Sequence, residues 1–181
     1  MNNLIFEKHC LTSEECRKII DYFESNKNLQ ILGKLQGKVT PEHKESTEIS
    51  GYLTWDNIVN HILIPAINSL TQDYIKTFPY LDMIESWQVD MGYNLQKYNP
   101  GQGFRSIHCE NGGLNRRMMA WMIYLNTVDD DGGTAFPQQD VILKAEEGKA
   151  VIWPAYWTHP HHGVISNTET KYIATGWYSF N

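Results

Sequence analysis

Two stretches in the first half of the chain place apolar residues at the three- and four-residue intervals of an amphipathic helix. Thr12 and Glu15 have the spacing of a capping box, which marks the start of the first stretch. The second stretch runs from Trp55 to Phe78, and Pro65 within it is expected to kink or divide the helix because proline lacks a backbone N–H. The pattern therefore predicts two helices. Their apolar positions are Cys16, Ile19, Ile20 and Phe23, and then Ile58, Ile62, Ile64, Leu70 and Tyr74.

The rest of the chain lacks this helical period. Residues 27–51 are rich in Lys, Gly, Glu and Ser, which predicts an irregular or hairpin-like connection. After Pro79, short strand-like runs alternate with turns rich in Gly, Asn and Asp. Helices first and many short strands afterwards favour an α+β fold, in which antiparallel strands form a sandwich or jelly-roll barrel and the helices pack outside. The expected strand regions are 87–98, 117–126, 149–157 and 171–180.

Length and composition indicate a single folded domain. A chain of 181 residues buries about two thirds of the surface that it exposes when unfolded. Its hydrophobic content of 41% excludes a disordered chain. We expect one domain over residues 1–181, with a helical support region at 1–80 and the jelly-roll core at 81–181.

Charge and the absence of targeting signals narrow the classes of partner. The net charge of −6 argues against nucleic acid as a partner. No apolar run approaches the ~20 residues that span a bilayer, and the N-terminus lacks the pattern of a signal peptide, so we expect a cytoplasmic protein without membrane association. Cys10, Cys16 and Cys109 have neither disulfide-framework nor zinc-finger spacing and are expected to be free thiols. The oligomeric state is not predictable from these features.

Histidines and a carboxylate in the second half of the chain suggest a metal site. His108 and Glu110 lie two residues apart, and on a strand both side chains would point to one face. Alone, such a pair is more often solvated or hydrogen-bonded. One histidine from the later group would complete a set of two histidines and one carboxylate, which suits iron(II) with open positions, whereas structural zinc sites are closed. That group comprises His159, His161 and His162.

Lys171 lies on the strand that follows the histidine group. A lone lysine is usually a surface residue. A dicarboxylic cosubstrate that chelates a metal at one end, however, needs a cation at its other end. Lys171 is therefore a candidate partner for a buried carboxylate.

Further short motifs accompany these residues in a fixed order over residues 87–178. They are Tyr98-Asn99-Pro100-Gly101, His108-Cys109-Glu110, Arg117 before Tyr124-Leu125-Asn126, Gly132-Gly133-Thr134-Ala135-Phe136, Gly148 before Ile152-Trp153-Pro154, the histidine group, and Lys171 with Trp177. In this order and spacing the chain resembles the prolyl 4-hydroxylase-like group of iron(II)- and 2-oxoglutarate-dependent dioxygenases. The motifs cover about half of the chain.

The resemblance implies a double-stranded β-helix, or jelly-roll, core with Fe(II) in its mouth and a 2-oxoglutarate pocket beside it. By position, Lys171 would pair with the far carboxylate of 2-oxoglutarate, Tyr124 would hydrogen-bond the same carboxylate, and Tyr98 would line the pocket near the metal. The segment from Gly132 to Phe136 is one residue shorter than in the family, and we expect it to act as scaffold. With dioxygen as cosubstrate, the implied reaction is hydroxylation of a C–H bond, and a prolyl residue in a peptide or protein is the favoured substrate.

The resemblance leaves the distal metal ligand open between two histidines. Its position five residues after Pro154 selects His159, whereas the spacing of about ten residues to Lys171 selects His161. We favour His159, because the strand before the ligand is rigid and the loop after it absorbs insertions. The predicted catalytic and metal-binding set is therefore His108, Glu110 and His159, with His161 touching cosubstrate or substrate.

Glu110 stands where the family usually has aspartate. Its additional methylene must be absorbed by a strand shift or a different rotamer. A carboxylate at this position nevertheless points to hydroxylation rather than halogenation.

Other functions stay open at this point. The same scaffold could hydroxylate a free amino acid or another small molecule. A non-catalytic metal-binding jelly roll and a hydrolase that uses metal-bound water are further alternatives. Lys171 and Tyr124 count against a mere metal scaffold, which would need neither.

Overall fold

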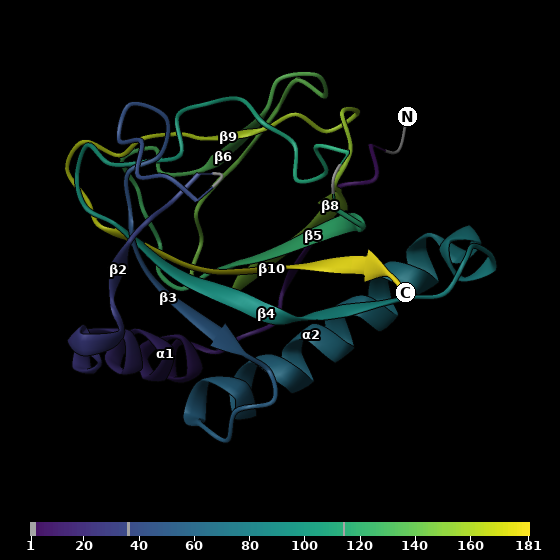
Figure 1. Cartoon of the computed structure of the whole chain (residues 1–181), viewed down its shortest axis with the longest axis horizontal. Coiled ribbons are helices and arrows are strands. Elements are labelled where there is room, and N and C mark those ends of the chain that lie inside the picture. Colours follow the sequence, from purple (N-terminus) through teal and green to yellow (C-terminus); the bar gives the residue numbers. More distant parts are fainter. Residues whose placement is uncertain (1–2, 36, 114) are drawn as a thin grey trace.

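The computed structural model describes residues 3–35, 37–113 and 115–181. A seven-stranded antiparallel sheet carries helices on its outer face, and a small three-stranded sheet lies over its inner face (Figure 1). This confirms the predicted α+β fold with helices outside the strands. The elements in chain order are β1 (Phe6–His9), α1 (Ser13–Ser25), the 3-10 helix η1 (Lys27–Leu29), β2 (Ile31–Leu32), β3 (Thr47–Tyr52), α2 (Ile58–Thr77), the 3-10 helix η2 (Pro79–Met83), β4 (Trp87–Tyr98), β5 (Arg117–Tyr124), β6 (Thr134–Phe136), β7 (Val141–Leu143), β8 (Lys149–Pro154), β9 (His162–Gly163) and β10 (Lys171–Phe180).

The helices begin and end largely where the pattern places them. Thr12 is the N-cap of α1, and its side chain and that of Glu15 exchange the two hydrogen bonds of the capping box. Helix α2 runs through Pro65 as a single helix, so the proline does not divide it. Its buried face packs against α1 and the large sheet, as Figure 1 shows. No helix in the described part of the chain has the length and apolar character that crossing a membrane requires.

The first 80 residues supply strands as well as helices. The large sheet has the order β1-β8-β5-β10-β4-β3-β2. Strand β1 pairs with β8, and β3 pairs with β4 over Thr47 to Tyr52. Residues 27–51 were predicted to be an irregular or hairpin-like connection, and within them β2 pairs antiparallel with β3. Strand β3 also joins β4, a partner that lies far away in sequence.

The inner face of the large sheet forms a second apolar cluster that the small sheet covers. In the antiparallel registers, Tyr124 pairs with Ile173, and Tyr98 pairs with Lys171, so these side chains share one face. The small sheet, of order β7-β6-β9, closes over them. The candidate site lies between the two sheets. Buried members of this cluster include Tyr98, Ala120, Met122, Tyr124, Phe136, Leu143, Val151, Trp153 and Ile173.

Candidate metal and cosubstrate site

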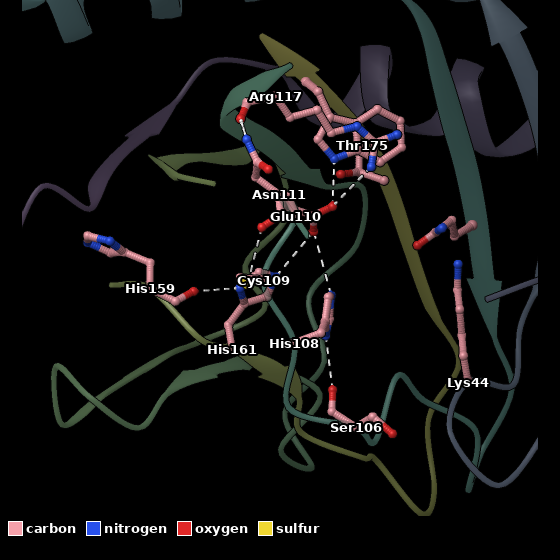
Figure 2. Close-up of polar contacts among 12 residues, drawn as sticks. Lys44, Ser106, His108, Cys109, Glu110, Asn111, Arg117, His159, His161 and Thr175 are labelled. Carbon is pink, nitrogen blue, oxygen red and sulfur yellow. Dashed lines mark hydrogen bonds and ion pairs between the residues drawn. The ribbon is translucent and has the colours of Figure 1, made fainter. Parts of the chain in front are cut away.

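His108, Glu110 and His161 bring three potential ligand atoms within 4.8 Å of one another. Nε2 of His108 lies 3.6 Å from Oε1 of Glu110, and Nε2 of His161 lies 3.3 Å from the same oxygen. Figure 2 shows the two imidazoles converging on this carboxylate. The Glu110 side chain is only 15% exposed, so the cluster occupies a recess of the protein.

The backbone holds the two histidines side by side. His108 and His161 form an isolated antiparallel bridge, in which each N–H donates to the carbonyl of the other, at 3.0 and 2.9 Å. Residues 108–110 do not form a strand, so strand alternation is not what brings the side chains of His108 and Glu110 together. The bridge, together with a hydrogen bond from Asn111 N to Ala155 O, nevertheless brings His108 and Glu110 to one place.

Hydrogen bonds to the backbone fix the orientation of both rings. Nδ1 of His108 lies 2.9 Å from the carbonyl oxygen of Ser106, and Nδ1 of His161 lies 3.0 Å from that of His159. Because a carbonyl only accepts, each Nδ1 carries the proton and donates it. Each Nε2 is then the atom that faces Glu110 and is available to a metal, which is the usual arrangement of metal-binding histidines.

The structure does not bring His159, the predicted third ligand, to this cluster. Nε2 of His159 lies 2.8 Å from the carbonyl oxygen of Asn3, and Nδ1 lies 2.9 Å from Oγ1 of Thr158. Burial lowers the pKa of His159, which favours the neutral ring. Strand β8 ends at Pro154 and a turn follows, so the rigid strand on which the choice of His159 depended does not extend that far. The distal histidine of the cluster is His161.

Two residues outside the predicted set complete the surroundings of Glu110. Nε1 of Trp177 donates to Oε2 of Glu110 at 2.7 Å, and NH1 of Arg117 lies 3.6 Å from the same oxygen. Both residues occur among the ordered motifs of residues 87–178, so the sequence did contain a signal for them. Burial raises the pKa of Glu110, but its contacts with His108 and His161 outweigh this and hold the pKa well below its usual range. Glu110 is therefore an anion at neutral pH.

Lys171 is a buried cation on the inner face of the large sheet. It is 6% exposed, and Nζ donates to the carbonyl oxygen of Gly132 at 2.7 Å. Nζ also lies 5.1 Å from the centre of the Tyr98 ring. Within the described residues it has no carboxylate partner, and burial lowers its pKa to about 8. A buried ammonium of this kind would be stabilised by an anionic ligand.

Two tyrosines share the inner face of the sheet with this cation. The hydroxyl of Tyr124 is 2.7 Å from Oγ1 of Thr134, which is two residues from Gly132. The hydroxyl of Tyr98 donates to Oε1 of Gln96 at 2.7 Å. Burial raises the pKa of both tyrosines, so both hydroxyls keep their protons. After burial, the charges of Glu48 and then Glu110 also raise the pKa of Tyr98.

The residues present fit a metal and a dicarboxylate. Two imidazole nitrogens and one carboxylate oxygen form the ligand set of metal sites that keep open positions. The buried amine on the same face supplies the charge that a second carboxylate needs. Thr134 is a hydroxyl donor that the sequence analysis did not single out, because its motif was expected to act as scaffold alone.

Comparison with known proteins finds one matching family model and several solved structures of similar fold. A family model described as the 2OG-Fe(II) oxygenase superfamily matches residues 93–179. No curated protein matches the chain in sequence. A prolyl-4-hydroxylase from Pseudomonas putida superposes with a TM-score of 0.75 at 16% identity, over 97% of this chain and 92% of its own.

Two further solved structures are similar. The viral collagen prolyl hydroxylase of Paramecium bursaria Chlorella virus-1, in a 2OG complex, has a TM-score of 0.70 at 16% identity, over 98% of this chain and 97% of its own. A prolyl hydroxylase from Trichoplax adhaerens, in complex with a hypoxia inducible factor peptide fragment, has a TM-score of 0.74 at 15% identity, over 98% of this chain and 84% of its own. At such identities the likeness shows the fold, and it confirms the double-stranded β-helix core.

Proposed function

We propose that this chain, which belongs to the 2OG-Fe(II) oxygenase superfamily through residues 93–179, hydroxylates a C–H bond of a prolyl residue in a peptide or protein. Membership makes it a 2-oxoglutarate-dependent dioxygenase. The single observation that carries the assignment of the site is the cluster of His108, Glu110 and His161 on the same inner face as the buried Lys171.

The metal ligands in this proposal are Nε2 of His108, Nε2 of His161 and Oε1 of Glu110. His159 is not among them, because its imidazole is engaged by Asn3 and Thr158. Bound by these residues, iron(II) would activate dioxygen, so that hydroxylation of the substrate is coupled to conversion of 2-oxoglutarate into succinate and carbon dioxide. The protein orients the ligands through the Nδ1 hydrogen bonds of the two histidines and shields the site from water.

Lys171 binds the far carboxylate of 2-oxoglutarate in this proposal. The amine is already desolvated, so an incoming carboxylate meets an ammonium that has no competing anion among the described residues. The hydroxyls of Tyr124 and Thr134 are close enough to each other for one to donate to the carboxylate while accepting from the other. Tyr98 forms the wall between this carboxylate and the metal ligands.

The prolyl substrate is supported by the structural neighbours, several of which are prolyl hydroxylases, one of them in complex with a peptide. A free amino acid or small metabolite is the alternative substrate, because one fold of this kind hosts several reactions. The identity of the substrate therefore depends on experiment.

Anaerobic titration of iron(II) and then 2-oxoglutarate into the metal-free protein tests the site. The chelate should give a weak visible charge-transfer band that is lost in His108→Ala and needs far more 2-oxoglutarate in Lys171→Ala. His162→Ala is the matched control, because its Nδ1 faces Gly163 O and it lies outside the cluster. Absence of the band in the wild-type protein would contradict the proposal.

Mass spectrometry tests the substrate. Proline-containing peptides should gain one oxygen atom in step with succinate release, and free proline should not. Turnover of free amino acids with no turnover of peptides would replace the prolyl peptide by the alternative substrate.

A further inference from the structure

The two carboxylate oxygens of Glu110 face different partners. Oε1 faces Nε2 of His108 and of His161, at 3.6 and 3.3 Å. Oε2 accepts the indole N–H of Trp177 at 2.7 Å. Figure 2 shows the contacts with His108 and His161 leaving one side of this carboxylate. Oε1 is therefore directed at the two histidines, and Oε2 is held away from them.

We infer that Trp177 is a positioning residue, whose hydrogen bond to Oε2 limits Glu110 to binding the metal through Oε1 alone. The inference rests on the proposed function, since it concerns the metal and 2-oxoglutarate. It goes beyond that function by explaining how this chain uses glutamate as its carboxylate ligand.

A glutamate ligand can bind one metal ion through both carboxylate oxygens more easily than the shorter aspartate can. Its additional rotatable bond lets the carboxylate turn and present both oxygens to one ion. Two histidines and one oxygen leave three positions of an octahedral ion open, enough for a chelating cosubstrate and dioxygen. A second oxygen of Glu110 on the ion would remove one of these positions.

Trp177 has the properties that such a restraint requires. The indole N–H is a donor without an acceptor lone pair, so it binds a carboxylate oxygen and does not itself bind a metal. Trp177 lies on β10 opposite Ala120 of β5, at the point where the pairing of β10 with β4 shifts register between Gly176 and Tyr178. The shift marks a bulge-type irregularity, a feature that redirects side chains.

Arg117 fixes the ring that makes this contact. Its guanidinium carbon lies 3.5 Å from the centre of the Trp177 ring, in a cation–π contact. NH1 lies 3.6 Å from Oε2 of Glu110, too far for a hydrogen bond but close enough to favour the negative charge there. Arg117 and Trp177 therefore act on the same oxygen of Glu110.

A restraint on Oε2 predicts opposite effects on two affinities. Without the indole N–H, Glu110 is free to use both oxygens, so the affinity for the metal alone is kept or increased. The affinity of the metal-loaded protein for 2-oxoglutarate falls, because the second oxygen competes for its position. Loss of a merely structural contact would weaken both.

A double-mutant cycle of Trp177→Phe and Glu110→Asp tests the inference. Phenylalanine removes the N–H and keeps an aromatic ring under Arg117. Aspartate is one methylene shorter and should not reach the indole, so the Trp177→Phe change should have no effect in the Glu110→Asp protein. For the four proteins, metal affinity is measured under argon by competition with a chromogenic chelator, and the Kd of 2-oxoglutarate is measured from the charge-transfer band.

The expected result is a rise of about tenfold or more in the Kd of 2-oxoglutarate for Trp177→Phe, the size of one lost hydrogen bond to a charged group. Metal affinity should not fall, and the Kd in the Glu110→Asp background should change by less than about twofold. An unchanged Kd in Trp177→Phe, an equal rise in both backgrounds, or a parallel loss of metal affinity would overturn the inference while the wild-type band still supports the proposed function. Absence of the band in wild type would overturn both.

Discussion

Nδ1 of His161 donates a hydrogen bond to the carbonyl oxygen of His159, at 3.0 Å. The two neighbouring histidines therefore have different tasks. His159 orients the ring of His161 through its backbone, while its own imidazole ties the segment to Asn3. Only His161 presents Nε2 to Glu110.

Exchanging each of these histidines for alanine should separate the two tasks. His161→Ala should abolish the iron(II)–2-oxoglutarate band, because it removes a ligand. His159→Ala should keep the band and lower the free energy of unfolding by roughly 1–3 kcal/mol, since it leaves buried polar partners unpaired. Denaturant unfolding and the anaerobic titration measure the two effects. The reverse pattern would return the ligand role to His159.

Removing the charge of Lys171 should stabilise the fold and impair cosubstrate binding. A pKa lowered from 10.5 to about 8 corresponds to a cost on the order of 3 kcal/mol for keeping the buried amine charged at neutral pH. Lys171→Met should therefore raise the thermal unfolding temperature, while the Kd of 2-oxoglutarate rises by about a hundredfold or more.

Lys149→Met is the matched control for this change. Lys149 is equally buried, but its Nζ lies 3.2 Å from Glu7 and 3.6 Å from Glu146. Its removal should destabilise the fold and raise the Kd of 2-oxoglutarate far less than Lys171→Met does, because Lys149 only flanks the ring of Tyr124, with Nζ 5.9 Å from its centre. If both variants changed stability in the same direction, an uncompensated charge on Lys171 would not be the explanation.

The affinity for 2-oxoglutarate should depend on pH above neutrality. With a lowered pKa of about 8, Lys171 is protonated at pH 7 and loses its charge as the pH rises through 8. A carboxylate binds the protonated form, so the affinity is fully present about one unit below the pKa, is reduced as the pH rises through 8, and falls by up to about tenfold per unit above it. Tyr98, whose ring lies beside the amine, and Tyr124, on the same face of the sheet, have raised pKa values and stay neutral in this range.

Calorimetric Kd values between pH 7 and 9 would show this slope, and the Lys171→Met protein should lack it. A flat profile in the wild-type protein would mean that the amine is not the carboxylate partner.

Two tyrosines of the pocket should differ in their importance for the cosubstrate. The hydroxyl of Tyr124 shares a hydrogen bond with Thr134 and is proposed to bind the same carboxylate as Lys171, so Tyr124→Phe should raise the Kd of 2-oxoglutarate roughly tenfold. The hydroxyl of Tyr98 donates to Gln96, so Tyr98→Phe should change the Kd by less than about threefold. Equal effects would indicate that both hydroxyls reach the cosubstrate.

Features with local causes were predictable from the sequence. The start of α1 depends on Thr12 and Glu15, which are neighbours in the chain, and the capping box confirms the prediction. Strand β1 was not predicted, and β3 was expected only as part of an irregular or hairpin-like connection, because each is short and pairs with a strand that is distant in sequence. Sequence patterns do not contain that pairing.

The same distinction holds for the candidate site. The spacing of His108 and Glu110 suggested a shared site, and the structure places them together, although through a backbone bridge rather than a strand. His159 was chosen on the assumption of a rigid strand beyond Pro154, and a turn there instead brings His161 into the cluster. The contact of Trp177 with Glu110 depends on how β10 lies against β5, which no local pattern reveals.

The backbone bridge between His108 and His161 also links metal binding to the hydrogen exchange of two backbone amides. Both ligand side chains are attached to the residues whose amides close the bridge, so any fluctuation that opens it also separates the ligands. Opening of the bridge then both exposes these two amides to hydrogen exchange and releases the metal. Added metal should therefore slow their exchange, by a factor that grows with the ratio of the free metal concentration to the Kd of the metal. Two amide signals would report occupancy of the centre without any turnover.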